Sequence, residues 1–175
     1  NMVRLAGEVS DGVGIGIMSS VAFVRDKVRP NARAGAEAAN RNPDALLFPT
    51  AATVSINRDV EAAREASKRA ICKLYHPIPH PYYDSQLRQM GFEEFADQAA
   101  ELIPAGRLRE AIELVPEEVV DTMTITGNLE QCIARVGDYE GVADELILAR
   151  TAQISDTQRI NDYEEFFHLV NHHAD

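Results

Sequence analysis

The chain has no tryptophan, only two cysteines, and no apolar run long enough to cross a membrane. Its longest apolar stretches, residues 13–17 and 146–149, fall far short of the roughly 20 residues that a spanning helix needs. Residues 1–7 also lack the apolar core of a signal peptide. We therefore expect no membrane partner and a cytoplasmic location.

The two cysteines, Cys72 and Cys132, lie far apart, each within a helical pattern. Their spacing is that of neither a redox pair nor a zinc knuckle. We expect two reduced structural thiols and no metal site.

Basic residues are scarce, with 17 Lys and Arg against 28 Asp and Glu and a formal net charge of -11 at pH 7. Such a chain repels phosphate backbones, so we expect no nucleic-acid partner. Its 175 residues, 45% of them hydrophobic, suit one globular domain with a sizeable core. We therefore assign residues 1–175 to a single domain.

Strand-like segments alternate with helical patterns along the chain. We predict strands at residues 13–17, 46–56 and 144–149, which are apolar on both faces and therefore typical of a parallel sheet. We expect a helix from Ser19 or Ser20, as N-cap, to about residue 40, with Pro30 kinking or splitting it. Residues 82–122 form a predicted all-helical insertion. No GxGxxG follows a strand, but the pattern alone leaves both a doubly wound sheet and a barrel open.

The prolines in HPIPHP (residues 76–81) exclude a helix there, although His76 and His80 have the spacing of paired metal ligands on a helix. The segment is either a lid loop or an ordinary surface crossing.

Six short motifs follow one another along the chain: LAGEVSDGV (5–13), ANRNP (39–43), DVEAA (59–63), VPEE (115–118), TGNLE (126–130) and GVADEL (141–146). In this order they resemble the luciferase-like monooxygenase superfamily, which includes F420-dependent methylene-tetrahydromethanopterin reductases. The first of them is similar to the family's LAGE(A/V)ADG segment.

The resemblance implies an α/β fold that is a partial TIM-like (β/α)8 barrel, with about three parallel strands and the helical insertion. A complete barrel takes about 250 residues, so the chain would hold roughly the last three strands. It would then be the carboxyl-terminal part of a flavin- or F420-dependent oxidoreductase acting on a small organic substrate. FMN or F420 would serve the full-length parent, with neither bound by this chain alone. The alternative is a truncated, non-catalytic module retained for binding or oligomeric assembly.

Barrel active sites lie at the carboxyl ends of the strands. This rule and the resemblance select candidate residues for binding substrate or cofactor after each predicted strand: Met18, Ser19, Ser20, Asn57, Arg150 and Thr151. Hydroxyls and a guanidinium suit an anionic or oxygen-rich substrate. The alternative is that Ser19 is only a helix cap and Arg150 only an ion-pair partner. No residue is assigned a catalytic role.

An open sheet leaves strand edges unpaired, and the strand at residues 13–17 has neither charge nor proline to protect its edge. We therefore expect a homo-oligomer. The alternative is that the helices of residues 82–122 fold over the open face and leave a monomer.

Overall fold

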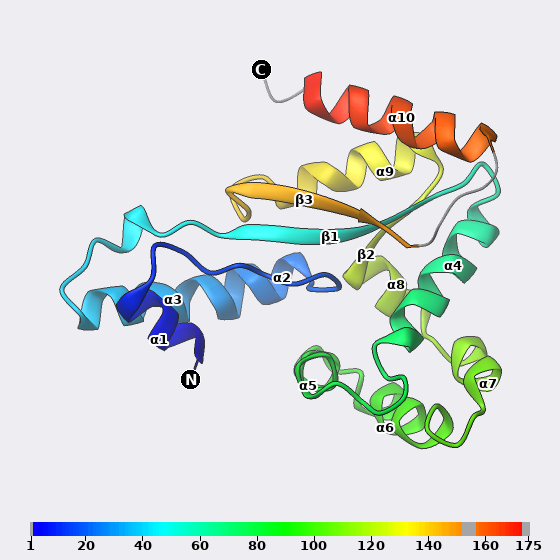
Figure 1. Cartoon of the computed structure of the whole chain (residues 1–175), viewed down its shortest axis with the longest axis horizontal. Helices are drawn as coiled ribbons and strands as arrows, with labels where there is room; N and C mark the ends of the chain where they lie inside the picture. Colours follow the sequence, from blue (N-terminus) through cyan, green and yellow to red (C-terminus); the bar gives the residue numbers. More distant parts are fainter. Residues whose placement is uncertain (1, 152–156, 173–175) are drawn as a thin grey trace.

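The computed structural model describes residues 2–151 and 157–172 and shows an α/β fold around a small parallel sheet (Figure 1). None of the helices in these two ranges is long and apolar enough to cross a membrane. The strands are β1 (Pro49–Ile56), β2 (Thr124–Gly127) and β3 (Glu145–Arg150). The longer helices are α1 (Met2–Val9), α3 (Arg29–Ala38), α4 (Val60–Lys73), α5 (Pro81–Gln89), α6 (Glu93–Leu102), α9 (Leu129–Val136) and α10 (Thr157–His172). The shorter helical elements are α2 (Val21–Phe23), α7 (Leu108–Glu113) and α8 (Glu117–Met123), the π-helix η1 (Val24–Val28), and the 3-10 turns η2 (Pro43–Ala45) and η3 (Gly137–Tyr139).

The sheet has the order β2-β1-β3, with both pairings parallel. Thr53 lies opposite Thr124 on one side of β1 and opposite Ala149 on the other. The predicted strands at 46–56 and 144–149 therefore exist with slightly shifted ends. The last strand lies beside β1, whereas simple barrel winding would place it beside β2.

The predicted strand at residues 13–17 is wrong as a continuous strand. Only two isolated parallel bridges connect this part of the chain with β1 and the residues before it. Gly12 pairs with Leu47, which precedes β1, and Ile15 pairs with Thr50 of β1. The amide of Ala51 donates to the carbonyl of Ile15, and further along the same edge Asn57 donates to Gly127 of β2. The segment therefore leaves β1 midway, and β2, which we did not predict, occupies the rest of that edge.

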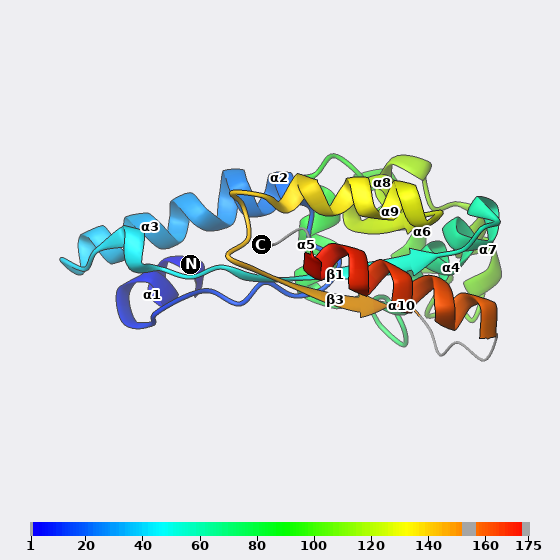
Figure 2. The same cartoon turned by 90° about the horizontal axis from the view of Figure 1, so that it is seen from above.

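Helices cover both faces of this sheet. We call the face formed by Ala52, Val54, Ile56 and Ile125 the apolar face; it packs on Cys132 of α9 and on Tyr163 and Phe166 of α10. The opposite face, formed by Thr53, Ser55, Thr124 and Thr126, is the hydroxyl face. Figure 2 shows α9 and α10 lying along β1 and β3.

Helix α4 packs on the hydroxyl face, opposite α9 and α10. Ser55 Oγ donates to the carbonyl of Ala63 at 2.9 Å, and the hydroxyls of Ser67 and Thr126 are 2.6 Å apart. Because α9 and α10 cover the apolar face, the helices of the predicted insertion are not the cover that we considered for it.

The helix expected from residue 20 to about 40 is built from α2, η1 and α3. Ser20 is its N-cap, with Oγ accepting from the amide of Phe23 at 3.0 Å. Pro30, which cannot donate to the preceding turn, lies in the first turn of α3, immediately after the π-helix. The expected interruption at Pro30 therefore takes the form of a widened turn.

Helices α1 and α3 cross with their backbones in contact. A Cβ built on Gly7 would lie 1.9 Å from the carbonyl oxygen of Ala32, and one on Gly35 would lie 2.0 Å from that of Arg4. No side chain larger than hydrogen fits at either position.

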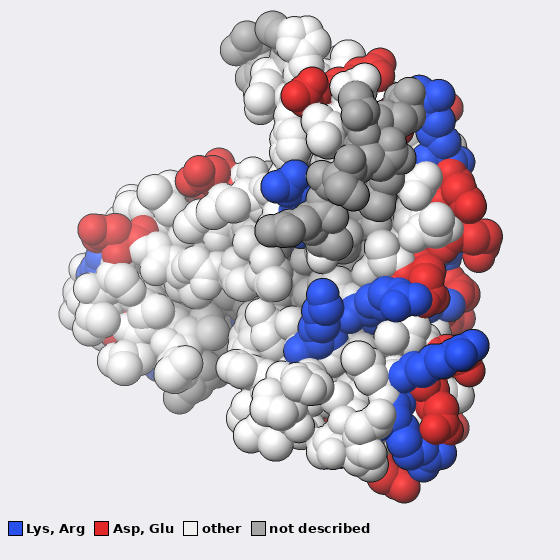
Figure 3. All heavy atoms as spheres, turned by 45° about the vertical axis from the view of Figure 1, so that its right-hand side comes forward, with Lys and Arg blue, Asp and Glu red and all other residues white. Residues whose placement is uncertain are grey.

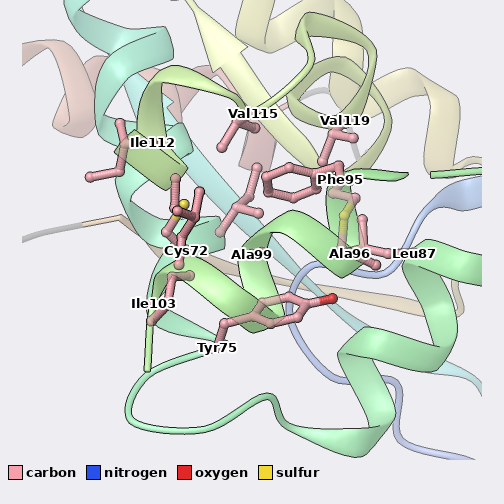
Figure 4. Close-up of a cluster of buried hydrophobic side chains, with 14 of the residues drawn as sticks. Cys72, Tyr75, Leu87, Phe95, Ala96, Ala99, Ile103, Ile112, Val115 and Val119 are labelled. Atoms are coloured by element: carbon pink, nitrogen blue, oxygen red, sulfur yellow. The ribbon is translucent and has the colours of Figure 1, made fainter. Parts of the chain in front are cut away.

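The predicted insertion contains α5 to α8, which enclose a core with α4 (Figure 4). Cys72, Tyr75, Leu87, Phe95 and Val119 are among its buried members. On the outside, Arg64 and Lys68 of α4 form ion pairs with Glu117 of α8. Figure 3 shows charges of both signs interleaved over this side of the molecule.

Candidate functional site

The carboxyl edge of the sheet carries two of the predicted site residues, Asn57 and Thr151. Each continues the backbone hydrogen bonding of a strand pair by one residue. The main-chain amide of Asn57 donates to the carbonyl of Gly127, and the main-chain amide of Thr151 donates to the carbonyl of Val54. Asn57 Oδ1 also accepts from the amide of Asp59, which caps α4. Thr151 Oγ1 is buried without a hydrogen-bond partner. Asn57 thus shapes a turn, and Thr151 has unused hydrogen-bonding capacity.

A cavity of about 420 Å³ opens at this edge, between α9 and α10. Its apolar wall is Ile56, Leu129 and Ile133, and its polar rim includes Arg58 and three carboxylates, Glu130, Asp162 and Glu165. Arg58 already pairs with Asp162 at 3.4 Å. The rim therefore has excess negative charge, which disfavours an anion.

The start of α9 is capped by side chains. Asn128 Oδ1 accepts from the amide of Gln131, while Gln131 Oε1 accepts from the amide of Asn128, which forms a capping box. A phosphate that binds the amide of Gln131 would have to displace the side chain of Asn128.

A second polar group forms where residues 17–20 meet α5, which begins after the proline-rich loop. Ser19 Oγ lies 3.2 Å from Tyr82 Oη and accepts from Gln86 Nε2 at 3.3 Å. Ser19 and Gln86 are buried, whereas the Tyr82 side chain is 40% exposed. Gln86 Oε1 is buried and has no partner.

The turn before Ser19 has an unusual backbone. Met18 has φ 62°, a left-handed conformation that costs free energy for a residue with a Cβ. Its side chain is buried in the core of the insertion. This packing holds Ser19 against α5.

Tyr82 also borders a cavity of about 370 Å³ that follows the glycine-containing segment. Val13, Ile15, Phe23 and Val28 contribute apolar walls. Beside it lies Tyr83, whose hydroxyl would be 3.7 Å from a Cβ on Gly16. Burial and then the neighbouring Tyr82 raise the pKa of Tyr83, so its phenol is neutral at physiological pH.

The sequence profile of the luciferase-like monooxygenase family matches residues 1–145. The chain belongs to this family. It is 28% identical over 154 residues to the 5,10-methylenetetrahydromethanopterin reductase of Methanopyrus kandleri, an alignment that covers 87% of this chain and 40% of that protein.

Solved structures agree with the predicted fold class, an α/β fold that is a partial TIM-like barrel. The F420-dependent tetrahydromethanopterin reductase from Methanopyrus kandleri superposes with a TM-score of 0.70 at 23% identity, covering 92% of this chain and 45% of that one. An F420-dependent secondary alcohol dehydrogenase gives a TM-score of 0.65 at 16% identity, covering 96% and 45%. The luciferase-like chain thus spans less than half the length of these relatives.

The structure brings the predicted site residues together only in part. Met18 and Ser19 lie against α5, and Ser20 is the cap of α2. Arg150 ends β3 with an exposed side chain, and within the described ranges no hydrogen bond or ion pair joins its side chain to another residue. The cluster formed by Ser19, Tyr82 and Gln86 is therefore uncharged.

Sequence reasoning missed Tyr82 and Gln86. They lie four residues apart and therefore on one face of α5. A glutamine on the face that also buries Leu87 was the available signal, because a buried amide needs polar partners.

Proposed function

We propose that this chain provides the carboxyl-terminal part of an F420- or flavin-dependent oxidoreductase that acts on a small organic substrate. The observation that carries the proposal is the 28% identity over most of the chain to a 5,10-methylenetetrahydromethanopterin reductase. Residues 1–175 then act as one unit, with residues 82–122 as its insertion. The free, buried thiols of Cys72 and Cys132 support a reducing, cytoplasmic compartment. The alternative, a non-catalytic module, has no specific observation in its favour.

The described residues do not fit the phosphate-bearing part of FMN or F420. Three carboxylates line the cavity at the carboxyl edge, and at the start of α9 the amides of Asn128 and Gln131 are already bound in the capping box. We therefore propose that the chain alone holds neither cofactor, and that the remainder of the barrel supplies their binding site.

Titration of the purified chain with FMN and with F420 tests this separation. We expect no saturable binding at micromolar concentrations by the chain alone. When it is co-produced with the amino-terminal part of the Methanopyrus kandleri reductase, we expect cofactor binding and cofactor-dependent turnover. Micromolar binding by the chain alone would contradict the proposed division of the site. Absence of turnover by a correctly assembled pair would contradict the proposed function.

We also propose a homo-oligomer. The edge at Gly14 and Gly16 is exposed, and so are Met2, Leu5 and Val9 on the adjacent α1. Burying such apolar surface between subunits would remove it from water. Light scattering coupled to size exclusion measures the mass: a multiple of 19.3 kDa supports the oligomer, and a single chain at tens of micromolar rejects it.

A further inference from the structure

The polar cluster beside the proline-rich loop contains an unmet hydrogen-bond requirement. Gln86 is 1% exposed, and its Nε2 donates to Ser19 Oγ, whereas its Oε1 has no partner. If the amide were turned around, the nitrogen would be the atom left unpaired, so one polar atom is unmatched in either orientation. Leaving such a group unpaired in the interior destabilises the fold, which calls for an occupant.

Tyr82 is the movable member of this cluster. Its hydroxyl lies 3.2 Å from Ser19 Oγ, a long distance for a bond between two hydroxyls. Its side chain is 40% exposed and borders the cavity of about 370 Å³. Ser19 and Gln86, in contrast, are fixed by burial. Tyr82 borders the cavity and contacts Ser19, whereas Ser19 and Gln86 do not line the cavity, so a ligand there reaches them only when the Tyr82 ring rotates.

The chemistry of the cluster restricts what could replace the phenol. Gln86 Oε1 needs a donor, and Ser19 Oγ–H needs an acceptor, so a single hydroxyl group satisfies both. In this orientation of the amide a carbonyl would leave Oε1 unpaired. With the amide turned around, a hydroxyl group would accept from Nε2 and donate to Ser19 Oγ, whereas a carbonyl could only accept. A buried ammonium or carboxylate would need an opposite charge, and Ser19, Tyr82 and Gln86 are all neutral.

We propose that Ser19 and Gln86 bind the hydroxyl group of a small, neutral alcohol with an apolar body, and that Tyr82 occupies this place when the alcohol is absent. The apolar walls from Val13, Ile15, Phe23 and Val28 receive the hydrocarbon part. The inference rests on the proposed function, because it names the substrate class of that oxidoreductase. Tyr82 then acts as a gate at the start of α5, directly after the loop that we considered as a lid.

The probes are cyclohexanol and cyclohexanone, which have nearly the same shape but differ in the hydroxyl hydrogen. Binding is followed by NMR on the full chain without cofactor, through the side-chain amide signal of Gln86, which is assigned by its loss in Gln86→Leu. We expect saturable shifts with cyclohexanol and roughly three- to tenfold weaker binding of cyclohexanone, corresponding to one hydrogen bond.

Three variants separate this site from a general apolar cavity. Tyr82→Phe removes the competing hydroxyl and should bind cyclohexanol roughly three- to tenfold more tightly. Ser19→Ala should lose the preference for the alcohol over the ketone. Gln86→Leu should lose this preference too, and ligand binding to it is followed through the backbone amide signals of Gly14 and Gly16. This variant keeps the test decisive if Ser19→Ala does not fold.

Equal affinities for the two probes in the wild-type chain would overturn the proposal, and so would the absence of a saturable shift in folded Tyr82→Phe. Either result would mean that the hydroxyl group of a ligand does not reach the Gln86 amide. Because no cofactor is present, these outcomes are independent of the turnover experiment on the assembled enzyme.

Discussion

Arg64 shows how one side chain joins two elements. Its guanidinium donates to Asp121 at 2.7 Å, to the carboxylate of Glu117 and to the Glu117 carbonyl at 3.2 Å. The side chain is only 17% exposed, so these bonds are partly shielded from water. The hydrogen bond that the guanidinium donates to Asp121 is the main reason that the pKa of Arg64 is raised.

We expect Arg64→Ala to lower the free energy of unfolding by about 2 kcal/mol, because it removes the hydrogen bonds of a largely buried guanidinium to Glu117 and Asp121, and only Glu117 keeps another partner, Lys68. Arg69→Ala is the matched control on the same helix, since Arg69 forms an exposed pair with Glu65 and should cost only about 0.3–0.5 kcal/mol. Urea unfolding measures both. Equal losses in the two variants would contradict the role given to Arg64.

Glu117 gives this contact a dependence on pH. The hydrogen bond from Lys68, followed by that from Arg64, lowers the pKa of Glu117 from its ordinary value of 4.5. A carboxyl group with a lowered pKa in the folded state stabilises above its unfolded pKa, and this stabilisation disappears as the pH falls through the folded value.

The stability difference between the wild-type chain and Glu117→Gln should therefore be present at pH 7 and shrink below about pH 4.5. Urea midpoints across this range test it. Glu118→Gln, at the next, exposed position, is the control, because Glu118 has no ion pair within the described ranges. A difference that persists unchanged at pH 3 would argue against the ion pairs as its source.

The candidate site shows how far single residues could be predicted. Ser19 and Ser20 were both possible caps, and the sequence could not tell which hydroxyl caps α2 and which turns inward. That choice depends on the left-handed turn at Met18 and on α5, more than 60 residues away in sequence. Tyr82 and Gln86 could not be connected to Ser19 without this tertiary contact.

The crossing of α1 and α3 depends on glycine in both helices. A methyl group on Gly35 would lie 2.0 Å from the carbonyl oxygen of Arg4, so the helices would have to separate. We expect Gly35→Ala to lower the free energy of unfolding by about 1–3 kcal/mol, as overpacking does.

Gly137→Ala is the control for this substitution. Gly137 has a right-handed helical conformation, and a Cβ there meets nothing within 4 Å. This change should be neutral or stabilise by up to about 1 kcal/mol through the unfolded state. A Gly35→Ala variant as stable as Gly137→Ala would mean that the helices do not cross as described.

Elements with strong local signals were predictable, and those that depend on distant partners were not. Helix α4 has Asp59 as its cap and an amphipathic pattern, so its start follows from the sequence. Strand β2 has only four residues, too few to establish a period, and exists because β1 offers it an edge. The segment at residues 13–17 has a strand-like composition, but it leaves this edge halfway along β1, and β2 pairs with the rest of the edge.

At the scale of the whole molecule, the order of the strands decides which surfaces are covered. Because β3 lies beside β1, α9 and α10 reach the apolar face, while α4 takes the hydroxyl face. Tyr163 of α10 fixes this arrangement: its hydroxyl donates to the carbonyl of Val54 at 3.0 Å and accepts from the amide of Ile56 at 3.1 Å. Composition and periodicity do not determine this strand order, because it depends on contacts between residues far apart in the sequence.

The same arrangement predicts a contrast in backbone hydrogen exchange. Strand β1 is paired on both edges and covered on both faces, so its amides should exchange only on extensive unfolding. The amides of Gly14 and Gly16 point away from β1, are exposed, and have no partner within the described ranges. They should exchange fast in an isolated chain.

Exchange measured at two protein concentrations also distinguishes the oligomer from the monomer. If subunits bury this edge, the protection of the Gly14 and Gly16 amides should rise with protein concentration, because it depends on association. The protection of the β1 amides should stay constant. Fast exchange of both glycines at every concentration would place any subunit interface elsewhere. Strong protection independent of concentration would mean that another part of the chain pairs with this edge, and the sheet order β2-β1-β3 would then be incomplete.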